Sequence, residues 1–414
     1  MLLRTKQFTK KVFNAEEYED PLYVKFILYI LIWMSIWSEY DFRQIPFEDI
    51  TRVGQRTLLY RDLFCVSWLL GRYCNYKCSY CWPYARSDEK DHRSTELVIS
   101  TLDEIKRQAR ERGFNSFHFS FSGGEPTLHP GYLKILEHYA NDLENVNYQT
   151  CHMTSNISPG IGWFKKYIEA TKNLHRVSIT ASYHREFAVK EKFADKLVFL
   201  QENDVHVTIN SVMVPELFED TWEDMLYFHE RGINVTLKPQ SNTSATKIVD
   251  GYTDDMLQKL RNGMPQRDYT GVRMKEKEKV STRPKAKLNK LPIDELSNEA
   301  VPPKFQVELT DKNKKAWYMD QAERFNAFEF NNFQDWECSA GYRSIIIREP
   351  DGTIKRSYSC NDEPLGHIEK GFNLFPKPMP CITKSCVSSA DSKIPKRKKN
   401  TKLPLWPGDT TFEI

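Results

Sequence analysis

The sequence lacks a strong net charge. Its 414 residues contain 59 Lys and Arg against 56 Asp and Glu, which leaves a formal net charge of +3. A chain this close to neutrality has no overall attraction for phosphate backbones, so we expect no specific nucleic-acid partner. Hydrophobic residues make up 40% and charged residues 28% of the chain, and no internal repeat is apparent. These proportions indicate a globular protein.

A clear membrane span and a clear export signal are also missing. The apolar run Leu22–Trp37 contains Lys25 and has 16 residues, short of the roughly 20 that cross a bilayer. We favour a buried or oligomer-forming helix here over contact with a membrane interface or a true span. The basic start "MLLRTKQFTKK" leads into "NAEEYEDP" without a cleavage site, so no signal peptide is recognised. We therefore expect a cytoplasmic protein with reduced thiols, and peripheral membrane contact through residues 22–37 as the alternative.

What the sequence does contain, after residue 60, is a regular alternation of strand and helix patterns. Strands are predicted at 63–70, 116–123, 147–156, 176–183, 205–214 and 233–240, and helices at 94–113, 131–143, 162–174, 186–203 and 221–232. Strict βα order favours a parallel sheet with its helices outside. We expect an α/β fold built on a partial (β/α)6 barrel that is open along one side.

The remaining segments divide the chain further. We expect an N-terminal extension at 1–60, the barrel at 61–240, a linker and aromatic-rich bridge at 241–335, a small C-terminal α+β module at 336–390 and a basic, mobile tail at 391–414. Residues 273–290 hold eight Lys and Arg against two Glu. A solvated linker is the simpler interpretation of this run, and binding to an acidic partner or leader peptide is the alternative.

Three of the nine cysteines lie in one short loop, "CNYKCSYC" at 74–81, directly after the first predicted strand. Three thiolates at the spacing Cys74-x3-Cys78-x2-Cys81 can hold three irons of a [4Fe–4S] cluster and leave the fourth iron open for a chelating molecule. Zinc is the alternative, but it needs a fourth Cys or His ligand. His92 is the nearest candidate in the sequence.

This loop resembles the CxxxCxxC motif of the radical S-adenosylmethionine (SAM) superfamily, in which an aromatic residue precedes the last cysteine. Tyr80 occupies that position, and "GGEP" at the end of the second strand resembles the turn that binds the amino group of SAM. Glycines allow close backbone approach, and a glutamate offers charge to an ammonium. The cofactor-site residues that the resemblance implies are Tyr80, Gly123, Gly124, Glu125, Pro126, Ser155, Asn156, Thr180, Ser182, Asn210 and Met213.

The resemblance also implies a mechanism. A reduced cluster would cleave SAM into methionine and a 5′-deoxyadenosyl radical, which takes hydrogen from a substrate C–H bond at the barrel mouth. Such an enzyme needs an electron donor of the flavodoxin or ferredoxin type and takes a small-molecule or peptide substrate. A peptide-modifying maturase or epimerase of the same superfamily is one alternative. A non-catalytic iron–sulfur or zinc scaffold is the alternative from another class, although it would not need a GGEP turn.

Four further cysteines lie near the C-terminus: Cys338, Cys360, Cys381 and Cys386. They surround a predicted hairpin with "PDG" at its turn. This arrangement resembles the auxiliary-cluster domains called SPASM and twitch, and four thiols suit one auxiliary [4Fe–4S] cluster. The closing pair is C-x4-C where C-x2-C is usual, and structural zinc or free thiols are the alternatives. Cys65 and Cys151 fall in predicted strands, where a core position is the simpler role and a hydrogen donor in the barrel the alternative.

Overall fold

The computed structural model describes residues 42–55, 62–82, 85–243, 247–264, 283–285, 307–319, 330–348, 351–386, 388–392 and 394–401. The apolar run Leu22–Trp37 and most of the basic segment 273–290 lie outside these residues. Within them, no helix is both long enough and apolar enough to cross a membrane.

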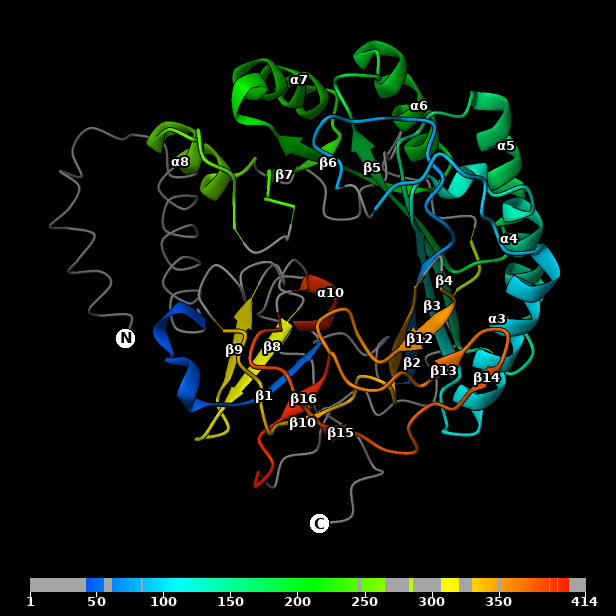
Figure 1. The fold of residues 1–414 in the computed structure, drawn as a ribbon, viewed down its shortest axis with the longest axis vertical. Helices are drawn as coiled ribbons and strands as arrows, with labels where there is room; N and C mark the ends of the chain where they lie inside the picture. The colour runs from blue at the N-terminus through cyan, green and yellow to red at the C-terminus, as the bar shows by residue number, and fades with distance from the viewer. Residues whose placement is uncertain are drawn as a thin grey trace, which may run out of the picture.

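Six parallel strands form the larger sheet, and each pairs with the next along the chain. They are β2 (Leu63–Leu69), β3 (Ser116–Ser122), β4 (Tyr148–Ser155), β5 (Arg176–Tyr183), β6 (His206–Met213) and β7 (Asn234–Pro239). Between them run α3 (Thr95–Arg110), α4 (Tyr132–Asn141), α5 (Ile161–Ala170), α6 (Lys190–Glu202) and α7 (Phe218–Glu230), followed by α8 (Asp254–Asn262). The alternation predicted from the sequence is confirmed, and Figure 1 shows α3 to α7 in an arc along the outer side of the sheet.

The two faces of this sheet differ in character. On the outer face, alternate residues such as Phe64, Val66 and Trp68 are fully buried against the helices. The inner face carries Ser67, His118, His152 and other polar side chains that are only partly buried. A parallel sheet usually has an apolar layer on both faces. The polar inner face therefore suits a curved, barrel-like sheet whose interior binds polar groups rather than a packed core.

The sheet remains open along one side within the described residues, because β7 pairs only with β6. At the other edge, β11 (Ser344–Arg348) pairs parallel with β2, with Ile345 opposite Val66. The predicted hairpin is confirmed, since β11 pairs antiparallel with β12 (Thr353–Lys355). It is not a separate unit as expected, because with β13 (Gly366–His367) and β14 (Gly371–Phe372) it extends the barrel sheet.

Hydrogen bonds from helix α3, and from Arg112 just after it, hold this C-terminal extension against the barrel. Gln108 donates from Nε2 to the Phe372 carbonyl and accepts at Oε1 from the Leu374 N–H, both at 2.9 Å. Arg112 donates from Nε to the Phe375 carbonyl at 3.0 Å. Buried side chain to backbone hydrogen bonds of this kind fix the relative position of two elements.

A second, smaller sheet joins segments that the sequence analysis assigns to different parts of the chain. Its order is β15 (Met379–Pro380), β10 (Glu337–Cys338), β16 (Lys396–Arg397), β1 (Ile50–Gln55), β8 (Val307–Asp311) and β9 (Ala316–Met319). In Figure 1 it lies on the inner side of the larger sheet, away from α3 to α7. Both residues of β16 are buried, so this part of the expected mobile tail is a structural strand.

Candidate active site

The cysteine loop and the GGEP turn lie side by side at the carboxyl ends of β2 and β3. The N–H of Gly124 donates to the Gly71 carbonyl at 2.9 Å, and the N–H of Glu125 donates to the Tyr73 carbonyl at 2.8 Å. The two motifs that the resemblance rests on are therefore joined through the backbone. Ligand sites of parallel α/β sheets are found at this end of the strands.

Close backbone approach explains the two glycines. A Cβ atom on Gly123 would lie 2.2 Å from the Gly71 carbonyl oxygen, and Gly123 also has a φ of +138°. A Cβ atom on Gly124 would lie 2.3 Å from the carbonyl oxygens of both Arg72 and Tyr73. Only glycine fits at either position. In this structure the glycines pack closely against residues 71–73, which lead into the cysteine loop.

Glu125 is 2% exposed, and both of its carboxylate oxygens accept hydrogen bonds from the protein. Oε1 accepts from the Thr127 N–H at 3.0 Å, the Thr127 hydroxyl at 2.6 Å and the Ser155 hydroxyl at 2.9 Å. Oε2 accepts from the Asn156 N–H at 2.6 Å. Burial raises the pKa of Glu125, while these hydrogen bonds oppose the rise. A carboxylate has about four acceptor positions, so the observed role of Glu125 is to tie the GGEP turn to the end of β4.

The structure brings Ser155 and Asn156 to this junction, as the resemblance implies. The Asn156 amide donates to Asn75 Oδ1 at 3.0 Å and lies 3.8 Å from Cys74 Sγ. Ser155 supports the turn that follows β4 by accepting from the Ile157 N–H at 3.0 Å. Both residues therefore position the cysteine loop. Their contact with SAM stays a prediction.

The three loop thiols are partly exposed, with Cys81 the most accessible. Burial raises the pKa of Cys74 and of Cys81, and burial together with the Glu186 charge raises the pKa of Cys78 to about 12. The surrounding protein thus disfavours the thiolate form of these cysteines, whereas a bound metal centre deprotonates its thiol ligands. The Tyr76 N–H donates to Cys74 Sγ at 3.4 Å, a type of bond found around cluster ligands. The donor set fits an iron–sulfur cluster.

A histidine that the sequence analysis missed lies against this loop. His184 Nδ1 is 2.7 Å from the Tyr80 hydroxyl and 3.3 Å from Cys78 Sγ. Burial lowers the pKa of His184 to about 4. His92, the histidine that the sequence suggested, packs instead against Gly71 and the His129 ring. No spacing rule points to His184, because it reaches the loop only through the β5–α6 connection.

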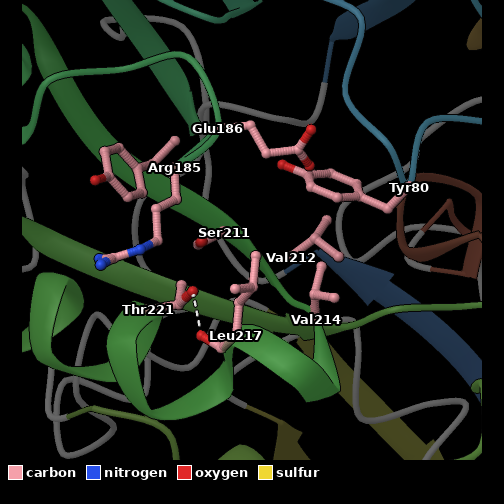
Figure 2. A pocket seen from close by; sticks show the side chains of 9 residues that line it. Tyr80, Arg185, Glu186, Ser211, Val212, Val214, Leu217 and Thr221 are labelled. Atoms are coloured by element: carbon pink, nitrogen blue, oxygen red, sulfur yellow. Dashed lines mark hydrogen bonds between the residues drawn. The ribbon is translucent and has the colours of Figure 1, made fainter.

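A small pocket of about 10 Å³ lies beside this loop, lined by Tyr80, Tyr183, Arg185, Glu186, Ser211, Val212, Val214, Leu217 and Thr221. Figure 2 shows Tyr80 next to Glu186 on one side and Arg185 on the other. The volume suits a single water molecule rather than a purine.

The other predicted cofactor residues divide between the two faces of the sheet. Thr180, Ser182 and Asn210 lie on the inner face, with Ser182 directly opposite Asn210. Met213 is fully buried in the apolar core on the helix side, so the structure gives no support to its predicted place in the cofactor site. Pro126 is buried and begins the short helical turn Pro126–Leu128.

The inner face carries a connected set of polar side chains below this site. His152 bridges Ser120 Oγ at 2.8 Å and Thr180 Oγ1 at 2.9 Å, and His118 Nδ1 lies 2.7 Å from Thr150 Oγ1. Within the part of the chain that the structure describes, Asn210 Oδ1 and His206 Nδ1 are buried without a hydrogen-bond partner. Unpaired buried polar atoms are costly and are typical of sites that bind a polar ligand.

Because side chains alternate between the two faces of the sheet, the two remaining cysteines lie on opposite faces. Cys151 is fully buried in the core between sheet and helices, which excludes it as a hydrogen donor to a substrate in the barrel. Cys65 occupies an inner-face position, opposite His118 on β3. Cys65 therefore stays a candidate, while Cys151 is the core residue that the simpler interpretation predicts.

The four C-terminal cysteines are all buried and interact with one another. Cys338, Cys381 and Cys386 belong to the apolar core around the smaller sheet. Hydrogen bonding from Cys381 lowers the pKa of Cys338, helped by the charges of Lys396 and Arg356. Burial raises the pKa of Cys360 and of Cys386, and the charge of Cys338 adds to the rise in both. Cys338 and Cys381 are therefore hydrogen-bonded to each other. That all four thiols hold one cofactor stays a prediction.

Two buried cations accompany these thiols. Lys396 is 1% exposed and donates to the carbonyls of Asp391 and Ser392, both at 2.8 Å. Arg356 is 3% exposed, and its Nε is buried without a partner among the described residues. Arg356 also forms an ion pair with Asp362 at 3.1 Å, so part of the positive charge beside the thiols is balanced by the protein. Within the described ranges, no group of three or more His, Cys, Asp and Glu side chains is placed to hold a metal ion.

Residues 68–262 match the family model described as the Radical SAM superfamily. No curated protein matches the chain.

Solved structures with weak similarity include histidine-tagged and native anSMEcpe, both described as having bound AdoMet. They are 17% and 18% identical to this chain over 42% of its length, with TM-scores of 0.34 and 0.35. The matched part covers 49% and 50% of those chains, about half of their length.

Proposed function

We propose that the chain is a radical SAM enzyme that holds its catalytic cluster on Cys74, Cys78 and Cys81. The observation that supports this most strongly is the backbone connection between the cysteine loop and the GGEP turn. When bound, the cluster supplies the electron that cleaves SAM to methionine and a 5′-deoxyadenosyl radical, which abstracts hydrogen from a substrate C–H bond. An electron donor of the flavodoxin or ferredoxin type would supply that electron.

The residues of the chain hold and orient the reactants. Gly123 and Gly124 bring the methionine-binding turn against the loop, and Glu125 links this turn to Asn156. The polar inner face, where Asn210 Oδ1 has no hydrogen-bond partner among the described residues, would bind a polar substrate through hydrogen bonds. A small molecule and a peptide both meet this requirement. Oxidation, epimerisation and rearrangement are all compatible with such a site.

The C-terminal cysteines would hold a second [4Fe–4S] cluster, as in SPASM or twitch domains. Four protein thiolates leave no open iron, so this cluster would accept an electron from the substrate or hold the module across the barrel. The burial of Arg356 and Lys396 beside the thiols supports an anionic group here.

The experiment is anaerobic reconstitution of the full chain, with iron and zinc analysis and measurement of 5′-deoxyadenosine after reduction with SAM. We expect about eight irons per chain from two clusters, and 5′-deoxyadenosine formation. Zinc bound at Cys74, Cys78, Cys81 and His184, without any 5′-deoxyadenosine, would instead establish a zinc scaffold.

A further inference from the structure

The connection between β5 and α6 packs directly onto the cysteine loop. Ser79 donates to the Glu186 carboxylate from its N–H at 3.0 Å and from its hydroxyl at 2.7 Å. The rings of Tyr76 and Phe187 stack with centroids 4.8 Å apart. Figure 2 shows Glu186 beside the Tyr80 ring. The segment His184–Phe187, which we call the β5 clamp, therefore contacts the loop at Tyr76, Ser79 and Tyr80.

His184 is the member of the β5 clamp that reaches a cluster ligand. Its ring stacks on Tyr80 with centroids 5.9 Å apart and meets Tyr76 edge-on. Nδ1 lies 2.7 Å from the Tyr80 hydroxyl and 3.3 Å from Cys78 Sγ. Interaction with Tyr80 lowers the pKa of Cys78, against the larger effect of burial. An imidazole nitrogen, a phenol and a ligand sulfur thus meet at one point.

The hydrogen-bond directions follow from the chemistry of the ligand. A metal-bound Cys78 is a thiolate, which accepts hydrogen bonds and donates none. Tyr80 can then donate its O–H to the sulfur, and its oxygen remains free to accept from an N–H. His184 fulfils this requirement when its proton is on Nδ1. Outer-shell partners of this kind orient metal ligands and tune the metal.

Resting on the proposed function, we propose that His184 is a positioning residue that directs the Tyr80 hydroxyl at Cys78 Sγ and thereby raises the reduction potential of the cluster. Reduction adds negative charge to the cluster and its sulfurs. A hydrogen bond to a ligand sulfur stabilises that added charge, so it favours the reduced state. His184 needs no contact with SAM or substrate for this role.

The test is the midpoint potential of the loop cluster, followed by electron paramagnetic resonance during redox titration of the reconstituted full chain. His184→Phe keeps an aromatic ring against Tyr76 and Tyr80 but removes the donor. We expect the ratio of reduced to oxidised cluster at a fixed potential to fall roughly tenfold, which corresponds to about 59 mV for one electron. His184→Asn, whose amide can occupy the place of Nδ1, should restore most of the potential.

A double-variant comparison separates this role from simple packing. If His184 acts through Tyr80, the potential of His184→Phe/Tyr80→Phe should equal that of Tyr80→Phe alone. His138→Gln serves as the matched control, because His138 lies on α4 and pairs only with Asp103 in the described structure.

Each outcome decides one claim. A wild-type potential in His184→Phe would overturn the inference. If His184→Phe binds no iron, a wild-type potential in Tyr80→Phe would overturn it. Equal shifts in His184→Asn and His184→Phe would overturn it as well. A wild-type protein that binds no iron at the loop would overturn the proposed function instead.

Discussion

The two groups of cysteines differ in how the protein surrounds them. Cys74, Cys78 and Cys81 lie in a partly exposed loop and approach each other through local spacing. Cys338, Cys360, Cys381 and Cys386 are buried, come from separate segments, and lie beside two buried cations. An accessible site with three thiols leaves room for a ligand on the metal centre, whereas a buried site with four does not. We therefore propose chemistry at the first group and electron transfer or structural support at the second.

Removing the loop thiols should have the largest effect on this comparison. In Cys74→Ala/Cys78→Ala/Cys81→Ala, 5′-deoxyadenosine formation should be lost, because no open iron would remain. The C-terminal thiols should still hold about four of the roughly eight irons. Chromatography of the products together with iron analysis measures both. Continued formation of 5′-deoxyadenosine would assign the catalytic cluster elsewhere.

Removing two C-terminal thiols should have the opposite pattern. Cys360→Ala/Cys381→Ala should lose about four irons and keep reductive cleavage of SAM. A structural cluster contributes its binding energy to folding, so the C-terminal sheet should unfold at a lower temperature than in the wild type. Calorimetry measures this, with Cys65→Ser as a control outside both groups. An electron acceptor without a structural role would leave the unfolding temperature unchanged.

A smaller effect is expected where the loop meets the GGEP turn. Gly124→Ala places a Cβ atom 2.3 Å from two carbonyl oxygens. Overpacking should cost about 1–3 kcal/mol and weaken iron binding at the loop alone. Gly162→Ala is the matched control, because a Cβ there meets nothing within 4 Å. Denaturant unfolding and iron analysis of both variants would show whether the close contact matters.

The smallest effect is expected for Glu125→Gln. The amide must turn an N–H toward one of four donors, so one hydrogen bond is lost, at a cost of about 0.5–1.5 kcal/mol in unfolding free energy. If Glu125 instead pairs with the SAM ammonium, SAM affinity should fall roughly 10- to 100-fold with unchanged stability. Calorimetric titration with SAM and denaturant unfolding distinguish the two roles. The four observed hydrogen bonds lead us to expect the first.

Local pattern was sufficient to predict the barrel and its first motif. Each strand and helix of residues 63–239 repeats a hydrophobic period, and the spacing of Cys74, Cys78 and Cys81 lies within one loop. The smaller sheet was not predictable in this way, because β10, β15 and β16 have two residues each and gain their order from partners distant in sequence. The same holds for His184 and Lys396, whose roles depend on tertiary contacts.

For Met213, the alternation of side chains along a strand predicts its position better than the family resemblance does. It was nominated from its place near the end of β6, yet neighbouring residues of a strand point to opposite faces. Asn210 and Met213 are three positions apart and therefore cannot both face the barrel interior. The burial pattern places Asn210 inside and Met213 in the core. Counting alternate positions from His206 would have excluded Met213 from sequence alone.

The pairing of β11 with β2 has a consequence for synthesis of the chain. β2 carries the cysteine loop, and one of its edges is covered only by a strand that leaves the ribosome after the whole barrel. Until then, the edge presents unpaired backbone groups beside aromatic residues, which is a known template for aggregation. Contacts between such distant segments also slow folding. Chains that end before residue 344 should therefore aggregate during expression, even though every strand of the parallel barrel is complete.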